Sequence, residues 1–290
     1  MSNQNMIALK NAVLLILFLI AFLLSRSVFA LEIKYSRVNP LMGGEMAHGE
    51  YLILKGEITP GDYDYLLKII WNDPARFLLN RIIVLASPGG DIQEAMKIAR
   101  FVKGVYATAY VGPDTGVCAS ACFFIFASAA YRLADARTVG IHRPYVDPRR
   151  LASLSPSQAE ALQNDLFRQA RSYLQELQIP TSIIDTMFQR ASSEVYWLSD
   201  AEQQIGRYAP WYEQFLIGRC GLNKSIEQRY FSGDESLLNH YGEVLRCGER
   251  LTETEAVTFL MNEFVKAGKS PEAVVLQFRV LNEFLKAGKR

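Results

Sequence analysis

The sequence predicts an α/β fold with an appended carboxy-terminal helical segment. Over residues 50–111, apolar runs rich in β-branched residues alternate with stretches in which apolar residues recur at helical spacing. A β-α-β-α-β order of this kind implies a parallel sheet with right-handed crossovers. Half of the 290 residues are hydrophobic and 11% are aromatic, which suits a well-packed core. Past Arg207 the chain becomes polar and helical, so we expect a separate helical segment there.

The first part of the alternation contains three strands and two helices. The run RIIVLA is too continuously apolar for a half-solvated edge strand, and Asn72-Asp73-Pro74 ends the first helix, since proline breaks the helical hydrogen-bond ladder. The expected strands span residues 50–58, 81–86 and 105–111, and the expected helices span residues 60–71 and 92–102.

The middle of the chain begins with an apolar stretch. Residues 118–130 are apolar on all sides of a helix, so we expect this helix to be buried. Short strands follow at residues 131–134 and 138–142. Ser155-Pro156-Ser157-Gln158 is a capping box with proline at the first helical position, and it opens a long helix to about Leu177. Shorter helices are expected to begin at Pro180-Thr181 and at a second capping box, Ser199-Asp200-Ala201-Glu202, the latter ending at Gly206.

The first thirty residues differ from the rest of the chain. A polar start with one cation, Lys10, precedes thirteen unbroken apolar residues from Ala12 to Leu24. Thirteen residues is a normal length for the apolar region of a secretory signal peptide and is short of the roughly twenty that cross a bilayer. We therefore expect residues 1–30 to be a signal peptide cleaved after Ala30, with an uncleaved amino-terminal membrane anchor as the alternative.

Export would bring the protein to the periplasm or cell envelope, and an uncleaved anchor would attach it to the inner membrane. Removal of residues 1–30 takes away two cations and no acids, so the formal net charge moves from +1 to −1. Neither value suggests a nucleic-acid partner.

Export also makes the four cysteines candidates for disulfides, with three alternative pairings. Cys220 and Cys247 flank a polar segment, and a bond between them would close a long loop. Cys118 and Cys122 would have Cβ atoms about 5–6 Å apart in a regular helix, beyond the roughly 3.8 Å that a disulfide prefers. A bond there requires Cys118 to precede the first helical turn, and the alternative is two small buried thiols. No second cluster of cysteine or histidine has zinc-ligand spacing.

The carboxy-terminal segment contains a repeat. Residues 261–269 (MNEFVKAGK) recur as residues 281–289 (LNEFLKAGK), and two copies are too few for a solenoid. We expect two similar amphipathic helices that form either a peripheral docking or oligomerisation element or simple surface helices.

A serine and a histidine are the candidate reactive groups. Ser120 lies among small residues in Cys-Ala-Ser-Ala-Cys, where a backbone or a substrate can approach closely, and His142 is the only histidine between positions 49 and 239. A serine with a histidine base is the skeleton of a nucleophilic site. Taken singly, each of the two residues is more often structural than catalytic.

Four phrases in the chain together resemble the proteolytic subunit of the Clp protease, and those around Ser120 and His142 look like exported Clp-protease-like proteins. The similarity covers roughly residues 50–206. It implies the ββα spiral of the Clp/crotonase superfamily for residues 31–207, with residues 208–290 as the appended helical segment. The phrases are Ser87-Pro88-Gly89-Gly90, Cys118-Ala119-Ser120-Ala121-Cys122, Gly140-Ile141-His142 and the run YWLSDAE at residues 196–202.

The resemblance implies a role for each matching position. Ser120 matches the nucleophile at the amino end of a buried helix, where unpaired amides and the macrodipole favour negative charge. His142 matches the general base that takes the serine proton. Gly90 and the amide of Ala121 match the two oxyanion-hole donors, and glycine suits that role because its backbone reaches positive φ and approaches the substrate oxygen closely.

The third catalytic residue departs from the family pattern. In the Clp subunit an aspartate lies two residues before the aromatic residue that Trp197 matches, and Val195 holds that position here. Glu194 is our candidate, because glutamate orients the histidine in some hydrolases. Asp185 and Asp200 are weaker candidates, since Asp200 is suited to stabilising a helix start. If no carboxylate reaches the histidine, the site is either a dyad or inactive.

These features imply a serine peptidase-like hydrolase of the cell envelope that cleaves peptides or unfolded proteins through an acyl-enzyme. The resemblance also implies a homo-oligomer, since Clp subunits stack into rings, and it implies no metal or other cofactor; the Gly-Gly pair lacks the context of a nucleotide-binding loop. One alternative is an inactive Clp-like fold that serves as a binding or assembly module. Another is a crotonase-like acyl-CoA enzyme, which export disfavours.

Overall fold

The computed structural model describes residues 31–36, 50–112, 116–199, 202 and 208–288. The chain divides into two units after Ala30, and the described residues belong to the second, Leu31–Arg290. The expected signal peptide or anchor at residues 1–30 lies outside them. None of the helices within the described ranges combines the length and the apolarity that a membrane crossing requires.

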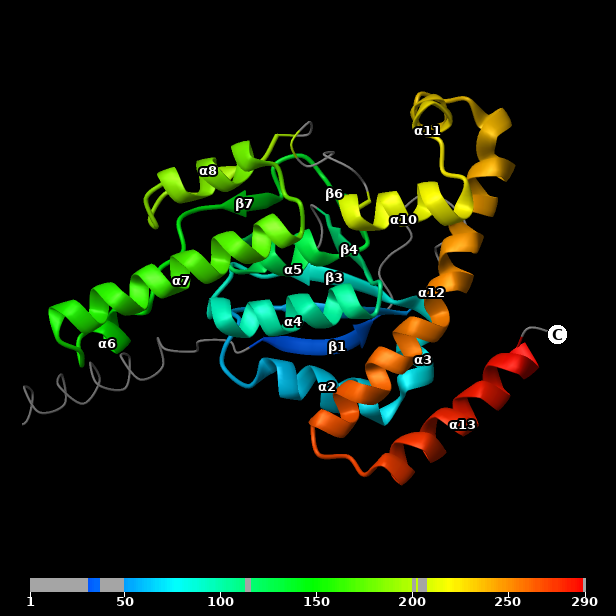
Figure 1. Ribbon diagram of the computed structural model, residues 1–290, viewed down its shortest axis with the longest axis horizontal. Helices are drawn as coiled ribbons and strands as arrows, with labels where there is room; N and C mark the ends of the chain where they lie inside the picture. The colour runs from blue at the N-terminus through cyan, green and yellow to red at the C-terminus, as the bar shows by residue number, and fades with distance from the viewer. Residues whose placement is uncertain (1–30, 37–49, 113–115, 200–201, 203–207, 289–290) are drawn as a thin grey trace, which may run out of the picture. The chain divides into compact units, whose positions relative to one another are not determined.

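A five-stranded sheet forms the centre of a mixed α/β fold (Figure 1). Four of its strands run parallel, as the alternation of strands and helices predicts, and the edge strand β1 runs antiparallel to β2. Strand β1 is the one member of this sheet that the pattern analysis does not anticipate. In spatial order the strands are β1 (Glu32–Ser36), β2 (Tyr51–Lys55), β3 (Ile82–Ala86), β4 (Thr108–Val111) and β6 (Tyr131–Ala134).

A second sheet of three short strands carries the candidate reactive residues. Its order is β5 (Cys118–Ala119), β7 (Val139–Ile141) and β8 (Tyr196–Trp197), with β5 parallel to β7 and β8 antiparallel to β7. The two sheets are joined by a parallel bridge between Cys118 and Ser87, the residue that directly follows β3. The second sheet therefore continues the carboxyl end of a strand in the first.

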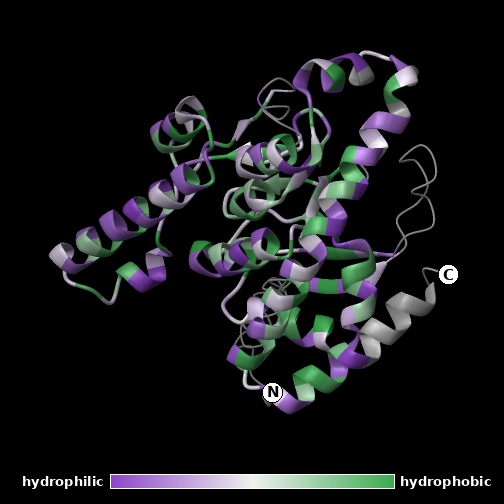
Figure 2. Cartoon of the chain, turned by 45° about the vertical axis from the view of Figure 1, so that its right-hand side comes forward, coloured by the Kyte–Doolittle hydropathy of each residue, from purple (hydrophilic) through white to green (hydrophobic). Residues whose placement is uncertain are grey.

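Four of the seven described helices that surround the sheets lie close to their predicted positions. The predicted capping box is present at the start of the longest of them, where the Ser155 and Gln158 side chains bond each other's backbone amides. Figure 2 shows hydrophobic residues gathered in the strands and adjacent helices, with hydrophilic residues prominent along this long helix at the left. The helices are α2 (Asp62–Asn72), α3 (Pro74–Asn80), α4 (Ile92–Gly104), α5 (Cys122–Ser128), α6 (Pro148–Leu151), α7 (Pro156–Glu176) and α8 (Thr181–Gln189).

Helices α3 and α6 are absent from the prediction, and both open with the same dipeptide. Asp73-Pro74 ends α2 as expected, but the Asp73 side chain also accepts a hydrogen bond from the Arg76 amide at 3.0 Å and so caps α3. Asp147 caps α6 in the same way. Proline is favourable at a first helical position because its missing N–H is not needed there.

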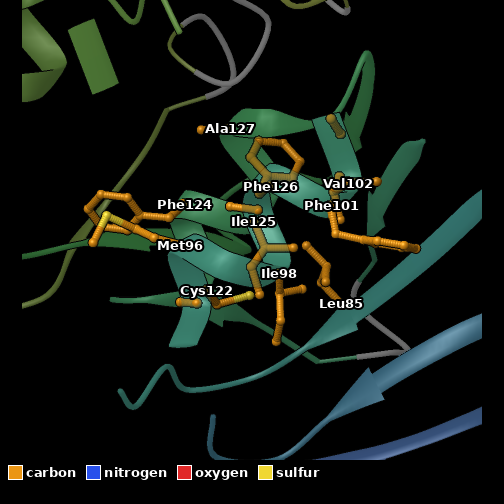
Figure 3. Packing of buried hydrophobic residues seen from close by; sticks show 14 of the residues in the cluster. Leu85, Met96, Ile98, Phe101, Val102, Cys122, Phe124, Ile125, Phe126 and Ala127 are labelled. Atoms are coloured by element: carbon orange, nitrogen blue, oxygen red, sulfur yellow. The ribbon is translucent and has the colours of Figure 1, made fainter. Parts of the chain in front are cut away.

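The centre of the core is helix α5, which is buried along its whole length, as its apolar composition predicts. Figure 3 shows its residues, among them Ile125 and Phe126, packed with Leu85 of β3 and with Ile98 and Phe101 of α4. Each fully buried aliphatic or aromatic side chain of this kind contributes about 1.5–3 kcal/mol relative to exposure. Because α5 is buried at the centre of this core, its packing also fixes the position of residues 118–121, which directly precede the helix.

The predicted helix over residues 118–130 is wrong at its amino end. Cys118 and Ala119 form β5 instead, and α5 begins only at Cys122. The amide of Cys118 donates to the Thr138 carbonyl at 2.9 Å, and the amide of Ala119 donates to the Ser87 carbonyl at 3.0 Å. Pairing with distant segments therefore overrides the local helical preference.

The appended segment packs against the helices of the α/β part. Helix α12 contacts α2 and α4, and α13 contacts α3 and α12. The ring of Phe259 in α12 lies so close over Gly104 that an added Cβ would come within 2.4 Å of it. The four helices are α10 (Pro210–Cys220), α11 (Lys224–Phe231), α12 (Leu238–Lys266) and α13 (Pro271–Gly288).

The two copies of the repeat fall at the ends of α12 and α13. In the first copy, Phe264 is buried and meets the ring of Trp71 edge to face, with ring centroids 4.9 Å apart. Residues 281–288 of the second copy lie within α13. One side of the first copy, which includes Phe264, therefore belongs to the hydrophobic core, whereas Val265 is exposed.

A hydrogen bond reinforces the contact between α12 and α2. The Tyr63 hydroxyl donates to the carboxylate of Glu263, a buried residue that also accepts from Lys266 at 2.6 Å. Burial of the ring, followed by the hydrogen bond to Glu263, raises the pKa of Tyr63, so the hydroxyl remains a donor.

We expect Tyr63→Phe to lower the free energy of unfolding by about 1–3 kcal/mol, because the buried Glu263 carboxylate loses a donor. Urea denaturation measures the loss. Tyr65→Phe on the same helix is the matched control: Tyr65 is 44% exposed, and its change is expected to stay within about 0.5 kcal/mol. Equal losses of unfolding free energy in the two variants would show that the hydrogen bond between Tyr63 and Glu263 does not stabilise the fold.

Candidate active site

Ser120 occupies a sharp turn between a strand and a helix. It follows the last residue of β5 and adopts a left-handed backbone conformation, with φ 58°. A residue other than glycine in this region carries strain of about 1–3 kcal/mol, so the surroundings must hold it there. Ala119 and Ala121 are buried on either side, whereas Ser120 is partly exposed. The turn therefore presents the serine side chain at the surface of a closely packed segment.

His142 lies beside this turn, on the neighbouring strand. Strands β5 and β7 run parallel with Ala119 paired to Gly140, and the Ser120 amide donates to the Gly140 carbonyl at 3.0 Å. Ser120 directly follows Ala119, and His142 lies two residues after Gly140. Because paired positions in adjacent strands lie about 5 Å apart, both residues leave the sheet at the same edge.

The imidazole of His142 is held in one tautomer. Its Nδ1 lies 3.0 Å from the Arg143 carbonyl oxygen. A carbonyl only accepts hydrogen bonds, so Nδ1 carries the proton and Nε2 of the neutral ring is left with its lone pair. The ring is 8% exposed and stacks on Tyr145, with ring centroids 6.1 Å apart. His142 is thus held in the tautomer whose Nε2 can accept a proton.

The Ser87-Pro88-Gly89-Gly90 loop packs directly against the serine turn. Gly89 has φ 104°, and a Cβ there would lie 2.6 Å from the Ser120 Cβ and 2.9 Å from the Ala121 nitrogen. The loop is held from the other side by Ile58, whose amide donates to the Gly89 carbonyl at 2.8 Å. Glycine is required because no side chain fits between these backbones.

Two amides at this contact have no acceptor among the described residues. Within the described part of the chain, neither the Gly90 amide nor the Ala121 amide donates a hydrogen bond to another residue. Both belong to residues at the junction between the glycine loop and the serine turn. Backbone amides without an internal acceptor are the kind of donor that stabilises an oxyanion.

The position opposite His142 holds no carboxylate. In the antiparallel pair, Gly140 is matched with Trp197 and Ile141 with Tyr196, which brings Val195 opposite His142. Glu194, the sequence candidate for the third residue, directly precedes Val195 and lies outside β8, where its amide donates to the Ala191 carbonyl at 3.0 Å. It is exposed, and no hydrogen bond joins it to His142.

The two weaker candidates for the third catalytic residue, Asp185 and Asp200, are not placed at His142 by the structure: one has another partner, and the other lies outside the described residues. Asp185 accepts a hydrogen bond from Arg171 at 2.9 Å. Asp200 is outside the described residues, as is most of the short helix expected up to Gly206. The reciprocal bonds of its capping box are present, because the Ser199 amide donates to the Glu202 carboxylate at 2.8 Å and the Glu202 amide donates to the Ser199 hydroxyl.

An exposed apolar face surrounds His142. Side chains alternate along strands, so Gly140 and His142 share one face of the small sheet with Val195 and Trp197. An added Cβ on Gly140 would lie 2.5 Å from Val195 and 3.0 Å from Trp197, which confirms that both lean over this strand. These two side chains are 39% and 38% exposed, and Tyr145 is 52% exposed. Sequence reasoning missed this face, since three isolated apolar residues carry no periodic signal.

All four cysteines are paired. Cys118 bonds Cys122 with Cα atoms 5.3 Å apart, and Cys220 bonds Cys247 with Cα atoms 5.6 Å apart. The first bond forms because Cys118 lies in a strand before the helix, which is the condition its spacing imposes. The alternative of free thiols is wrong. Among the described residues, no group of three or more His, Cys, Asp or Glu is arranged to hold a metal ion.

Comparison with known proteins finds little. No protein-family model and no curated protein matches the chain. Among solved structures, a point mutant of the 1510-N membrane-bound stomatin-specific protease aligns with 54% of this chain and 74% of its own, at 20% sequence identity and a TM-score of 0.36. The functional assignment therefore rests on the residues of the site.

We expect Gly90→Ala to lower the free energy of unfolding by about 2–4 kcal/mol, measured by chemical denaturation. Gly90 has φ 141°, and a Cβ would lie 2.1 Å from the Ile58 carbonyl oxygen. Gly61→Ala is the matched control, since φ is 100° there but no atom lies within 4 Å, and its loss is expected to be about 1–2 kcal/mol. If both variants lose the same amount, the close approach of the loop is not the cause.

Proposed function

We propose that this protein is a serine hydrolase of the peptidase type that acts through a dyad of Ser120 and His142. The observation that carries the proposal is the pairing of Ala119 with Gly140, from which both reactive residues leave adjacent strands at one edge. Peptides or unfolded proteins are the proposed substrates. The proposal includes a Clp/crotonase-type ββα spiral for residues 31–207 and self-association of the chain, in keeping with the four sequence phrases.

The reaction begins at the serine hydroxyl. Ser120 Oγ attacks the carbonyl carbon of the scissile peptide while His142 Nε2 takes the hydroxyl proton. The amides of Gly90 and Ala121 donate to the oxygen that becomes negatively charged, and one such donor typically lowers the barrier by about 2.7–4 kcal/mol. The carbon–nitrogen bond then breaks as the imidazolium gives its proton to the leaving amine. Water attacks the acyl-serine in the second half, with His142 again as the base.

A backbone carbonyl takes the orienting role of the usual carboxylate. The Arg143 oxygen holds His142 in the tautomer that leaves Nε2 free. It has no full charge with which to stabilise the imidazolium, and loss of the carboxylate in a triad typically lowers turnover by about 10⁴-fold. We therefore propose a slow hydrolase rather than a fast one.

The second candidate function is a binding module without catalysis. It is favoured by the valine opposite His142 and by the exposed apolar face that Tyr145 and Trp197 contribute. The same face would hold apolar side chains of a bound peptide in either function. The serine hydroxyl and the two free amides distinguish the candidates, because a binding module has no need of them.

Two disulfides support export to an oxidising compartment, since such bonds persist there and are rare in the cytosol. We propose the periplasm or cell envelope as the location. Residues 1–30 would direct the chain there, as a cleaved signal peptide or as an anchor.

A fluorophosphonate probe tests the nucleophile. We expect the full chain to be labelled at pH 7–8, with a phosphorus–oxygen bond to Ser120 replacing the phosphorus–fluorine bond, and Ser120→Ala to abolish labelling. His142→Ala is expected to slow labelling by about 10²-fold or more, because the base is lost. Intact-protein mass spectrometry measures both. Ser153→Ala, at an exposed serine in the connection between α6 and α7, is the control and is expected to label like the wild type.

Absence of labelling in folded wild-type protein would overturn the hydrolase and favour the binding module. Circular dichroism and thermal unfolding of each variant identify proteins that have lost their fold.

A pair of variants tests the dyad. We expect Glu194→Gln to label within about twofold of the wild type, since Glu194 forms no hydrogen bond to His142. Val195→Asp introduces a carboxylate opposite His142 and is expected to raise the rate at least about tenfold, with Val195→Asn as the uncharged control. A tenfold loss in Glu194→Gln would restore a triad with Glu194 as its third member.

A further inference from the structure

The Cys118–Cys122 disulfide encloses the serine turn. Cys118 lies two residues before Ser120 in β5, and Cys122 lies two residues after it at the first position of α5. Neither cysteine exposes any surface, whereas Ser120 between them is partly exposed. The bond therefore joins the strand and the helix that lead into and out of the turn, from the buried side.

The local sequence favours a different conformation from the one observed. Residues 118–130 have the composition of a continuous buried helix, and two alanines flank Ser120. Extension of α5 by one turn would return Ser120 from φ 58° to the ordinary helical region and relieve its strain. It would also withdraw the serine amide from the Gly140 carbonyl. A helical extension is thus the competing state for the turn.

The disulfide excludes that competing state. Positions four apart in a regular helix have Cβ atoms about 5–6 Å apart, and a disulfide prefers roughly 3.8 Å. With the bond in place, Cys118 cannot join the helix that Cys122 begins. Three amide hydrogen bonds hold the same segment, but each of them can open independently, whereas a covalent bond cannot.

The second disulfide provides a contrast. Cys220 and Cys247 are 27 residues apart in sequence and link α10 with α12, whereas Cys118 and Cys122 are four apart. In the chain-entropy description, a bond that closes a longer loop constrains the unfolded chain more. The Cys220–Cys247 bond is therefore expected to stabilise the whole fold, whereas the Cys118–Cys122 bond, which closes a loop of five residues, is expected to act on the local backbone.

We infer that Cys118 and Cys122 are positioning residues whose disulfide keeps Ser120 in its reactive conformation. The inference rests on the proposed role of Ser120 as a nucleophile. It identifies a part of the site that contacts no substrate and acts only through the backbone of the turn.

Two double variants of the full chain test the inference. Cys118→Ala/Cys122→Ala is expected to slow fluorophosphonate labelling of Ser120 at least tenfold and, with a chromogenic ester substrate, to lower kcat more than it raises KM. Cys220→Ala/Cys247→Ala is expected to unfold at a lower denaturant concentration but to label within twofold of the wild type. Equal labelling rates in both double variants would overturn the inference.

Hydrogen exchange gives a readout that needs no activity. The Ser120 amide is expected to exchange at least tenfold faster in Cys118→Ala/Cys122→Ala, because its bond to Gly140 opens, while the Ala95 amide in α4 is unchanged. If the exchange rate of the Ser120 amide is the same in the wild type and the variant, the inference is overturned, whether or not the wild type is labelled. If the wild type is not labelled but the exchange rate rises as expected, only the proposed hydrolase activity is contradicted. If the double alanine variant does not fold, Cys118→Val/Cys122→Ala restores volume and strand preference for the same measurements.

Discussion

Three consecutive amides hold the structure of the site together. Those of Cys118 and Ser120 donate to carbonyls on the β7 side, and the amide of Ala119 between them donates to Ser87 on the β3 side. Alternate donation to two neighbours is the ordinary behaviour of a central strand, here only two residues long. Ser87 directly follows β3 of the large sheet and is bridged to Cys118, so β5 joins the large sheet to the small one. The glycine loop, the serine turn and the histidine strand all take their positions from it.

The sequence is informative where structure is local and less so where it depends on distant pairing. Capping by Ser155 and the apolar run before Ala86 identify α7 and β3 because the determining residues are adjacent. Residues 118–121 have helical composition, and only their contacts with strands elsewhere in the chain make them a strand and a turn. For the site, the motif order identifies Ser120, His142 and the glycine loop, whose segments the structure brings together. It does not reveal the Arg143 carbonyl, since every residue has one, or the aromatic ring of Tyr145 over His142.

The register of β7 and β8 determines which side chains surround His142. Antiparallel pairing matches Ile141 with Tyr196, and side chains alternate between faces, so a shift of one residue exchanges every neighbour of His142. The observed register places valine and tryptophan on the same face as His142, and no hydrogen bond joins the imidazole to Glu194. His142 therefore lies among apolar side chains, and the neutral Arg143 oxygen fixes the direction of its ring without supplying a full negative charge.

The left-handed turn at Ser120 also restricts which residues evolution can use there. Glycine, asparagine and aspartate enter this backbone region most readily, serine does so with strain, and β-branched residues are strongly disfavoured. Threonine carries the same reactive group as serine, yet its branched Cβ excludes it from this position. A lineage that no longer needs a hydroxyl can replace Ser120 by glycine or asparagine and relax the turn. Chains with glycine or asparagine at this position would then have the more stable turn, and those that keep the serine would retain the strain.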